Sequence, residues 1–360
     1  MGSKATFIIL SPGFPESEAD STCLPMQQQF VKTLKEIHPE LDVVVLTFQY
    51  PYHQQGYKWF GIKVIPFGGR NKGGLKKRLL RSKINSTLKI LYKERNIAGL
   101  FSFWYNECAF IGKKFADKRG IKHYCWILGQ DARQGNKYPK LLPPRSNELV
   151  ALSDFIQNEF EKNHGIKPQF VVAPGFDETL FDSMPGEKDI DILGVGSLIP
   201  LKQYDIFLET IAEIKNQFPE TKAFLVGKGP EKERLELLIN SFELENNVRM
   251  TGELPYNEVL RLMKRAKIFL HPSSYEGFSG VCMEALSAGS HIVSFCKPMN
   301  KDIPHWHIAK NRADMVLETL RILRDPMTRY LSLQPYSIRD CVKQILDLFG
   351  EKHSPTEKEA

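Results

Sequence analysis

The chain has 360 residues, 42% of them hydrophobic and 25% charged, a composition that excludes disordered and fibrous proteins. Its length is sufficient for about two domains of ordinary size. Lys and Arg outnumber Asp and Glu by 49 to 42, and an excess of this size indicates a charged partner only where the cations are clustered.

No part of the sequence has the pattern of a membrane span or a secretory signal. The longest apolar runs are far shorter than the roughly 18 residues that a spanning helix needs, and no signal-peptide pattern precedes the first of them. The six cysteines include no C-x-x-C pair, which favours reduced thiols over a disulfide framework. We therefore expect a cytoplasmic location.

Short apolar runs alternate with helical patterns through the first half of the chain. Strands are expected at residues 6–10, 42–48, 99–104 and 122–128, and helices at residues 24–37, 75–93 and 109–119. Alternation of this kind predicts a parallel sheet covered by helices.

The helix expected at residues 75–93 lies in a strongly basic part of the chain, since residues 63–95 contain eleven Lys or Arg and one acid, Glu94. Apolar residues recur on it at spacings of three and four, which predicts an amphipathic helix: Leu75, Leu79, Leu80, Ile84, Leu88 and Leu91. Two interpretations stay open, a surface that docks on anionic lipid or an anionic glycan carrier, and a helix packed on its own domain with a solvated basic face. Nucleic acid is not expected as a partner, because no nucleic-acid-binding module accompanies the charge.

The second half repeats the alternation. Strands are expected at residues 191–197, 222–229, 247–253, 267–274 and 291–295, and helices at residues 204–217, 232–239, 257–264 and 281–288. Residues 173–190 contain Pro and Gly and are typical of a linker, here between a domain at 1–172 and a domain at 191–330. A last helix is expected within residues 331–349, and residues 350–360 are expected to be disordered.

Ligands of open α/β sheets bind at the carboxyl ends of the strands, so ligand-binding residues are expected there. Two of them carry short Gly-x-Gly motifs, Gly194-Val195-Gly196 and Gly227-Lys228-Gly229, each of which is weak evidence alone. A third, "HPSSYEGFSGVCMEALSAG", begins at His271 and enters an expected helix near Gly280. It carries the strongest functional signal in the chain.

This third segment has the residue types expected around a diphosphate and two sugar rings. The backbone N–H groups of residues 277–281 form an anion site that glycines leave accessible. Glu276 and Glu284, eight positions apart, lie on either side of it, and carboxylates beside a phosphate are expected to bind hydroxyl groups. One acid would accept hydrogen bonds from a sugar and the other from a ribose, with the pyrophosphate on the amides and on Lys202. This is the order of groups in a nucleotide sugar.

Residues 274–289, "SYEGFSGVCMEALSAG", resemble the E-x7-E segment of the family 4 glycosyltransferases. The similarity in order and spacing extends from residue 171 to residue 295 and includes "GVGSLIPLKQYDIFLETI" and "FPETKAFLVGKGPEKERLELLI". The first domain is similar in layout only. The resemblance implies the α/β GT-B fold, with two Rossmann-like parallel-sheet domains facing each other across a cleft and a C-terminal helix returning to the N-terminal domain.

The resemblance also implies a retaining glycosyltransferase of the hexosyltransferase type. The sugar would pass from a UDP- or GDP-sugar to a glycan or lipid-linked glycan, in cell-surface polysaccharide or glycolipid synthesis, without a metal cofactor. Glu276 would contact the donor sugar and Lys202 the diphosphate, both at the reacting centre, while Glu284 would hold the ribose. The donor-binding residues indicated are Gly196, Ser197, Lys202, Gly227, Lys228, Glu276, Gly277, Phe278, Ser279, Gly280, Val281 and Glu284.

The sequence departs from the family pattern at two positions. Ser197 stands where the family has an Arg, which makes Lys228 the alternative phosphate cation, and Leu128 stands where the family has a His in the first domain. These departures keep two alternatives open: a non-catalytic protein that binds a nucleotide sugar or a glycan, and an epimerase on the same fold.

Residues of the first domain are candidates for the acceptor side of the site. Gly13 follows the first strand and is expected to let a ligand approach the backbone closely. Glu107 either lines an acceptor pocket or caps the following helix, and Asp131 and Arg133 follow an expected strand.

Overall fold

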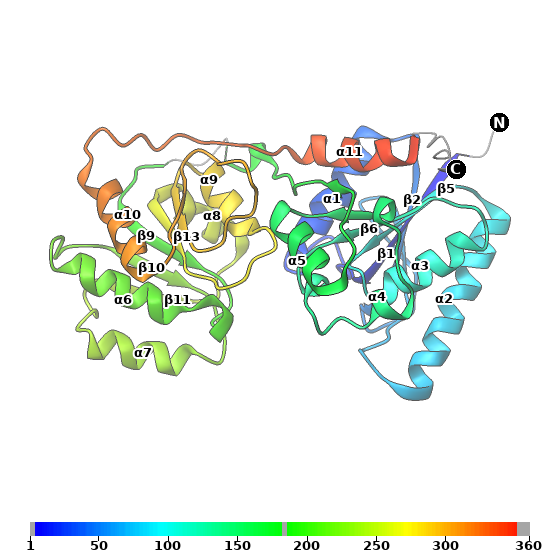
Figure 1. Ribbon diagram of the computed structural model, residues 1–360, viewed down its shortest axis with the longest axis horizontal. Coiled ribbons are helices and arrows are strands. Elements are labelled where there is room, and N and C mark those ends of the chain that lie inside the picture. Colours follow the sequence, from blue (N-terminus) through cyan, green and yellow to red (C-terminus); the bar gives the residue numbers. More distant parts are fainter. Residues whose placement is uncertain (1–3, 182–185, 351–360) are drawn as a thin grey trace. The chain divides into compact units, whose positions relative to one another are not determined.

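The computed structural model describes residues 4–181 and 186–350, and it divides into two compact units (Figure 1). The first unit comprises Met1–Gly175 and Ile338–Ala360, and the second comprises Phe176–Ser337. Part of the expected linker, residues 182–185, and all but the first residue of the expected disordered tail, residues 351–360, lie outside the described residues. Within the described ranges, no helix is long and apolar enough to cross a membrane.

The first unit is built on an eight-stranded sheet in the order β3-β4-β2-β1-β5-β6-β7-β8. All neighbouring strands are parallel except β3 and β4, which form an antiparallel pair. The strands are β1 Ala5–Gly13, β2 Asp42–Tyr50, β3 Tyr57–Trp59, β4 Ile62–Pro66, β5 Asn96–Phe103, β6 His123–Ile127, β7 Leu149–Ala151 and β8 Phe170–Val171. The sheet grows in one direction from β1 through β2 and in the other from β5 onward, so the topological switch point lies between β1 and β5.

Helices cover both faces of this sheet, which explains why β1 and β2 are almost continuously apolar. Ile8 and Leu10 belong to a buried cluster with residues of β2 and of the helix at Gly74–Glu94. The Phe7 ring, on the other face, contacts the ring of Phe349 in the helix at Ile338–Gly350. The helices are α1 Pro25–Ile37, α2 Gly74–Glu94, α3 Glu107–Asp117, α4 Tyr138–Leu141, α5 Asp154–His164 and α11 Ile338–Gly350, with 3-10 turns at Gln130–Ala132 and Ser146–Glu148.

The last helix, α11, belongs to the first unit although it follows the second unit in sequence. Its Phe349 ring lies 4.8 Å from the Phe7 ring and 4.9 Å from the Tyr124 ring in edge contacts. Lys122 Nζ donates hydrogen bonds to the carbonyl oxygens of Leu348 and Phe349, both at 3.1 Å. The expected return of a C-terminal helix to the N-terminal domain is confirmed.

The basic helix α2 forms where expected, but its buried stripe is shorter than the spacing predicted. Leu80, Ile84, Leu88 and Leu91 are buried, whereas the side chains of Leu75 and Leu79 are 75% and 63% exposed. The inclusion of Leu75 and Leu79 in the packed face was therefore wrong. The first turns of α2 project beyond the rest of the first unit (Figure 1).

The second unit contains a six-stranded sheet of parallel strands in the order β11-β10-β9-β12-β13-β14. Counted within this unit, the order is 3-2-1-4-5-6, which is that of doubly wound nucleotide-binding sheets, with a switch point between β9 and β12. The strands are β9 Ile190–Val195, β10 Ala223–Val226, β11 Val248–Gly252, β12 Ala266–His271, β13 His291–Ser294 and β14 Trp306–Ile308. The helices are α6 Tyr204–Lys215, α7 Lys232–Ser241, α8 Tyr256–Arg265, α9 Gly280–Ser287 and α10 Arg312–Arg324, with 3-10 turns at Glu178–Phe181 and Pro200–Lys202.

Candidate functional site

Two loops meet at the switch point of the second sheet. One follows β9 and contains Gly196 to Gln203, and the other follows β12 and leads into α9. The backbone N–H of Ser274 donates to the carbonyl oxygen of Leu201 at 3.0 Å, which joins the loops directly. Because ligands of such sheets bind outside the carboxyl ends of the strands at the switch point, this is where the second unit is built to bind one.

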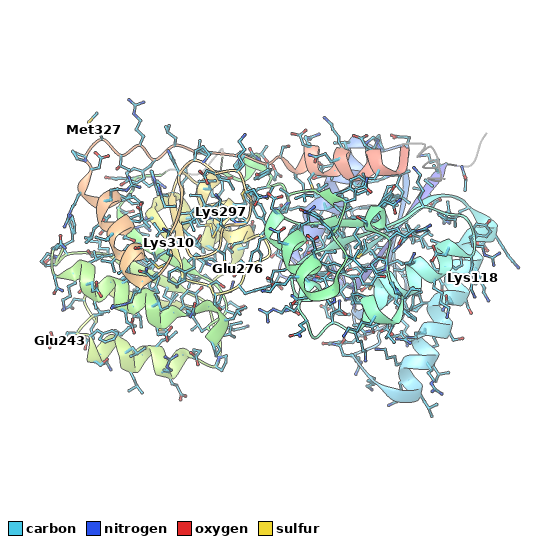
Figure 2. All side chains as sticks on the ribbon, in the orientation of Figure 1. Lys118, Glu243, Glu276, Lys297, Lys310 and Met327 are labelled. Carbon is cyan, nitrogen blue, oxygen red and sulfur yellow. The ribbon has the colours of Figure 1, made fainter. Side chains whose placement is uncertain are left out.

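The two loops bring Lys202 and Glu276 together although they lie 74 residues apart in sequence. The Lys202 ammonium forms an ion pair with Glu276 Oε1, and His271 Nε2, at the end of β12, lies 3.1 Å from the same oxygen. Both side chains of the ion pair are 17% exposed, and Glu276 is marked in the second unit in Figure 2. The sequence assigned these two residues to different groups of one ligand, and the structure shows that they are also partners of each other.

The cluster fixes the charge of each group. Burial opposes ionisation of Glu276, but the hydrogen bond from His271 and the charge of Lys202 lower the pKa of this carboxyl to about 2. Burial lowers the pKa of His271, so its imidazole is neutral near pH 7 and donates through Nε2. The site therefore presents an ionised carboxylate, an ammonium and a neutral imidazole.

Glu284 lies on α9 and has a different partner from Glu276. The Tyr256 hydroxyl, at the start of α8, donates a hydrogen bond of 2.9 Å to Glu284 Oε1. Burial raises the pKa of Glu284 to about 7, although the Tyr256 hydrogen bond acts in the opposite sense. Glu284 is therefore poised between its neutral and ionised forms at physiological pH.

The N-terminus of α9 lies between these two acids in sequence. Its N-cap, Ser279, makes no side-chain capping bond, and a Cβ added to Gly280 would meet nothing within 4 Å. Ser279 Oγ instead lies 3.4 Å from His271 Nε2. The Phe278 ring is buried against Trp306 and Tyr336, so this residue has only its backbone to offer a ligand. Gly277 precedes it in the loop, and Val281 lies in the first turn of the helix.

Gly196 and Gly227 have a reason in the fold itself. Their φ angles are 155° and 150°, and a Cβ on Gly227 would lie 1.8 Å from the carbonyl oxygen of Gly196. The loops after β9 and β10 thus cross at a distance that only glycine permits. Ser197 is exposed beside them, and Lys228, the alternative phosphate cation, is an exposed side chain paired with Glu253.

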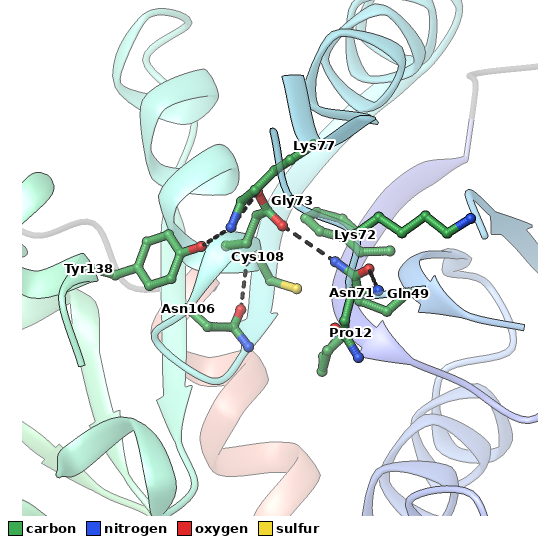
Figure 3. A pocket seen from close by; sticks show the side chains of 11 residues that line it. Pro12, Gln49, Asn71, Lys72, Gly73, Lys77, Asn106, Cys108 and Tyr138 are labelled. Carbon is green, nitrogen blue, oxygen red and sulfur yellow. Dashed lines mark hydrogen bonds and ion pairs between the residues drawn. The ribbon is translucent and has the colours of Figure 1, made fainter. Parts of the chain in front are cut away.

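The first unit has a cavity of about 210 Å³ at the carboxyl ends of β1, β2 and β5, and Glu107 lines it. Figure 3 shows Gln49, Lys77 and Tyr138 around the same cavity. Arg81 Nε donates to Glu107 Oε1 at 2.7 Å, and Gln49 Nε2 donates to Oε2 at 3.3 Å. Lys77 Nζ lies 3.6 Å from the same carboxylate and 3.1 Å from the Tyr138 hydroxyl. Asn106 is the N-cap of α3, so Glu107 does not have the capping role, and its role at an acceptor pocket stays a prediction.

The other candidates of the first unit have different surroundings. The Asp131 carboxylate is buried and accepts bonds from three backbone N–H groups, those of Tyr105, Leu128 and Gly129, at 2.7–3.0 Å. Burial raises the pKa of Asp131 to about 6 against the effect of these bonds. The Asp131 oxygens thus hold the loops after β5 and β6, and Asp131 also lines the second cavity of the first unit, which Arg133 lines too.

Arg133 and Gly13 are the remaining candidate residues of the first unit. Arg133 is exposed and, with Trp104 and Gln130, lines a second cavity of about 410 Å³ at the ends of β5 and β6. A Cβ on Gly13 would lie 3.7 Å from Tyr50 Cβ, an ordinary contact, so no protein atom demands a glycine there.

Sequence reasoning missed His271, Tyr256, Lys77 and Arg81 as parts of these sites. His271 had one available signal, its position as the last residue of an apolar strand that runs into the glycine-containing loop. The described residues contain no group of three or more His, Cys, Asp or Glu side chains that could hold a metal ion.

Solved structures place the fold. The chain matches the crystal structure of HepE from Anabaena in complex with UDP-glucose, with a TM-score of 0.69 over 96% of this chain and 99% of that one, at 16% identity. A glycosyltransferase from Rickettsia africae matches with a TM-score of 0.71 over 97% and 100% of the two chains, at 13% identity. The fold is therefore GT-B, the two-domain architecture of a large class of glycosyltransferases.

Sequence comparison finds a family model that matches part of the chain, and several glycosyltransferase relatives. Residues 176–309 match the sequence model of the family described as glycosyl transferases group 1, so the match falls within the second unit. The gpi3 subunit of the phosphatidylinositol N-acetylglucosaminyltransferase of Schizosaccharomyces pombe is 31% identical over 134 residues, which is 37% of this chain and 29% of the relative. An uncharacterized glycosyltransferase of Methanocaldococcus jannaschii is 24% identical over 280 residues, 74% of this chain and 73% of that protein. The putative colanic acid biosynthesis glycosyltransferase WcaL of Escherichia coli is 28% identical over 194 residues, 49% and 47% of the two chains.

Proposed function

We propose that the protein is a retaining glycosyltransferase that transfers a sugar from a nucleotide diphosphate sugar to a hydroxyl of a glycan or lipid-linked glycan. The observation that carries this proposal is the joining of Lys202, Glu276 and the N-terminus of α9 at the switch point of a nucleotide-binding sheet, within the residues that match the group 1 family. These groups match the charges of a diphosphate and the hydroxyls of a sugar.

In this proposal the donor lies across the carboxyl ends of β9 and β12. The backbone N–H groups of residues 277–281 and the Lys202 ammonium hold the diphosphate, and Glu284 accepts hydrogen bonds from the ribose. An ammonium has three N–H donors, so Lys202 can keep its bond to Glu276 while it binds a phosphate oxygen. Glu276, ionised and fixed by His271 and Lys202, accepts hydrogen bonds from the donor sugar.

The chemistry assigned to the second unit is stabilisation of the leaving group. As the bond between the sugar and the diphosphate breaks, negative charge develops on the diphosphate oxygen. Lys202 and the amides of α9 are positioned to stabilise that charge. No metal ion is included in the proposal, and an assay with and without a chelator tests this point.

The proposed donor base and acceptor class are based on what the similar proteins are named for or were crystallised with. HepE was crystallised with UDP-glucose, which is why UDP-sugars, with GDP-sugars as the alternative, are the first donors to test. The Escherichia coli relative is named for colanic acid biosynthesis and the Schizosaccharomyces pombe relative for phosphatidylinositol, which supports a polysaccharide or glycolipid acceptor. Glu107 and Arg133, in the cavities of the first unit, are the proposed acceptor contacts.

We also propose that residues 75–93 of α2 dock on an anionic membrane surface at its cytoplasmic face. Leu75 and Leu79 are exposed beside Lys76 and Arg78, and exposed leucines among cations are the pattern of an interfacial helix. We expect the protein to co-sediment with anionic vesicles at low salt, and Leu75→Glu with Leu79→Glu to abolish this. Leu317→Glu, at an equally exposed leucine of α10, is the matched control and is expected to bind as the wild type does. Equal binding by all variants would contradict the docking role.

A donor and acceptor panel tests the function. The protein is incubated with UDP- and GDP-sugars and with glycan and lipid-linked acceptors, and both free nucleotide and glycosylated product are measured. Product with retained anomeric configuration supports the proposal. Binding without turnover would support the non-catalytic alternative, to which Ser197 and Leu128 point, and an epimerised donor would support an epimerase.

A further inference from the structure

The hydroxyl of Tyr204 is buried and has no hydrogen-bond partner in the part of the chain that the structure describes. Tyr204 is the first residue of α6, and its side chain is packed edge-on against Phe207 with only 3% of the residue exposed. Buried hydroxyl groups in folded proteins nearly always have a partner, since burying one without a partner is unfavourable. This orphan hydroxyl therefore requires an explanation.

The position of the hydroxyl indicates what its partner is. A Cβ built on Gly196 would lie 2.7 Å from Tyr204 Oη and 3.7 Å from Lys202 Cε. The hydroxyl thus lies against the backbone of the loop after β9, beside the Lys202 side chain. Its fixed neighbour is the glycine, and its movable neighbour is the long lysine side chain.

A second orphan polar atom belongs to the same site. Nδ1 of the buried His271 has no partner among the described residues, while its Nε2 contacts Glu276. The Lys202–Glu276 ion pair is therefore flanked by two buried polar groups with unused hydrogen-bonding capacity. Burial and the nearby Glu276 charge raise the pKa of Tyr204, so its hydroxyl is a neutral donor throughout the physiological range.

We propose that Tyr204 is a further donor-site residue, whose hydroxyl donates a hydrogen bond to the phosphate chain of the nucleotide sugar when Lys202 engages the same phosphate. The proposal rests on the proposed function of this site. It assigns a reason to Gly196 as well, because any larger residue there would collide with the hydroxyl.

The test is Tyr204→Phe, which deletes one oxygen atom that has no internal partner. We expect the free energy of unfolding of the unliganded variant to be unchanged or higher than that of the wild type. Affinity for UDP or GDP, measured by calorimetry, is expected to fall about tenfold, the effect of one hydrogen bond to a charged group, while the weak affinity for uridine or guanosine stays unchanged. Tyr105→Phe is the matched control, because the Tyr105 hydroxyl is buried in the first unit and donates to the Leu142 carbonyl oxygen at 2.6 Å. That control is expected to lose stability and to keep its nucleotide affinity.

A double-mutant cycle of Tyr204→Phe with Lys202→Ala measures the coupling between the two side chains in diphosphate affinity. A purely structural role of Tyr204 would not produce such coupling. If both side chains bind the same phosphate, the loss in the double variant is smaller than the sum of the single losses. Equal diphosphate affinity in Tyr204→Phe and the wild type would overturn this inference alone. A loss of unliganded stability like that of the Tyr105 control would also overturn it, because the hydroxyl would then have an internal partner such as an ordered water. Absence of any nucleotide diphosphate binding by the wild type would overturn the proposed function and this inference together.

Discussion

Two glutamates eight positions apart on one segment have opposite electrostatic surroundings. Contacts with His271 and Lys202 lower the pKa of Glu276 to about 2, whereas burial raises the pKa of Glu284 to about 7. Environments that separate the pKa values of two neighbouring acids assign them different tasks. In the proposed donor site, Glu276 would keep a permanent negative charge near the donor sugar, and Glu284 would bind hydroxyl groups.

The raised pKa of Glu284 carries a cost in stability that Glu284→Gln is expected to relieve. Between pH 4.5 and about 7, Glu284 is protonated in the folded state and ionised in the unfolded state. The group therefore destabilises the folded state increasingly as the pH rises through that range. Urea unfolding is expected to show the Gln variant more stable than the wild type by up to about 3 kcal/mol at pH 9 and by less than about 1 kcal/mol at pH 5. Nucleotide affinity of the same variant is expected to decrease. A stability difference that does not depend on pH would contradict the assignment.

At the residue scale, the sequence predicted which side chains belong to the candidate donor site but not how they contact one another. The spacing of Glu276 and Glu284 around a glycine-containing helix start indicated the site, and Lys202 came from a matched segment. Their direct contact was not predictable, because it depends on β9 and β12 being neighbours in the sheet across 74 residues of sequence. The contacts of Asp131 were not predictable for a related reason, since only the path of the loops brings their backbone N–H groups to its carboxylate.

At the scale of elements, two histidines connect the edge of the second sheet to the chain that leaves it. Arg321 Nη2 of α10 donates to His307 Nδ1 at 3.1 Å, and the other His307 nitrogen lies 3.0 Å from His291 Nδ1. His291 Nε2 donates to the carbonyl oxygen of Arg329 at 3.2 Å. Because the two ends of this chain fix the direction of every bond, both imidazoles must be neutral. Two further titratable side chains contact this pair of histidines. The His305 ring stacks on the His291 ring at 4.2 Å, and Glu318 Oε2 lies 3.8 Å from His307 Nδ1.

Acid is therefore expected to weaken this edge. Burial and the nearby Arg321 charge lower the pKa of His291 to about 4, although the hydrogen bond to the Arg329 carbonyl oxygen acts in the opposite sense. The unfolded state therefore binds a proton between pH 6.5 and 4 that the folded state does not. Stability from this group is complete above pH 6.5 and is lost as the pH falls toward 4. In urea unfolding, His291→Asn is expected to flatten the slope of stability against pH in that window. His53→Asn, at an exposed histidine, is expected to leave the slope as in the wild type, and equal slopes in all three proteins would contradict the account.

Packing of α11 on the first sheet includes one very close contact, whose energy a double-mutant cycle can measure. A Cβ on the buried Gly99 would lie 2.2 Å from the ring of Phe349. We expect Gly99→Ala and Phe349→Ala each to destabilise the protein by about 2 kcal/mol, the first by collision and the second by lost packing. In the Phe349→Ala background the added methyl group has room, so its cost should fall to near zero. Gly135→Ala, which meets nothing within 4 Å, is the control, and additive losses would show that α11 is not held by this contact.

Most long elements were predictable from periodicity, and the short strands were not. The central strands of both sheets and most of the helices that cover them lie within a few residues of their expected positions, but α5 and α10 were not predicted. The sequence analysis did not identify β3, β4, β7, β8 and β14, because strands of two to five residues are too short to show an alternation. Leu75 and Leu79 of α2 follow the same helical period as the buried leucines of that helix. The period therefore could not show that these two side chains are exposed.

At the scale of the whole molecule, the same architecture occurs twice. Each unit contains a sheet whose strand order reverses beside its first strand, and each places charged and polar side chains at the carboxyl ends there. In the second unit these side chains are Lys202 and Glu276, and in the first they are Glu107 and Lys77. The account assigns the donor to the second unit and the acceptor to the first, and the donor assignment is its central claim.

Calorimetric titration of a nucleotide diphosphate and its monophosphate into the wild type and Lys202→Ala tests that claim most directly, with the exposed Lys310→Ala as control. The account predicts that the wild type and the control bind UDP or GDP alike. It further predicts that Lys202→Ala loses about tenfold or more in affinity for the diphosphate, and clearly less for the monophosphate, because the removed ammonium contacts the diphosphate chain. Diphosphate affinity in Lys202→Ala equal to that of the wild type, or no diphosphate binding by the wild type at millimolar concentration, would contradict it.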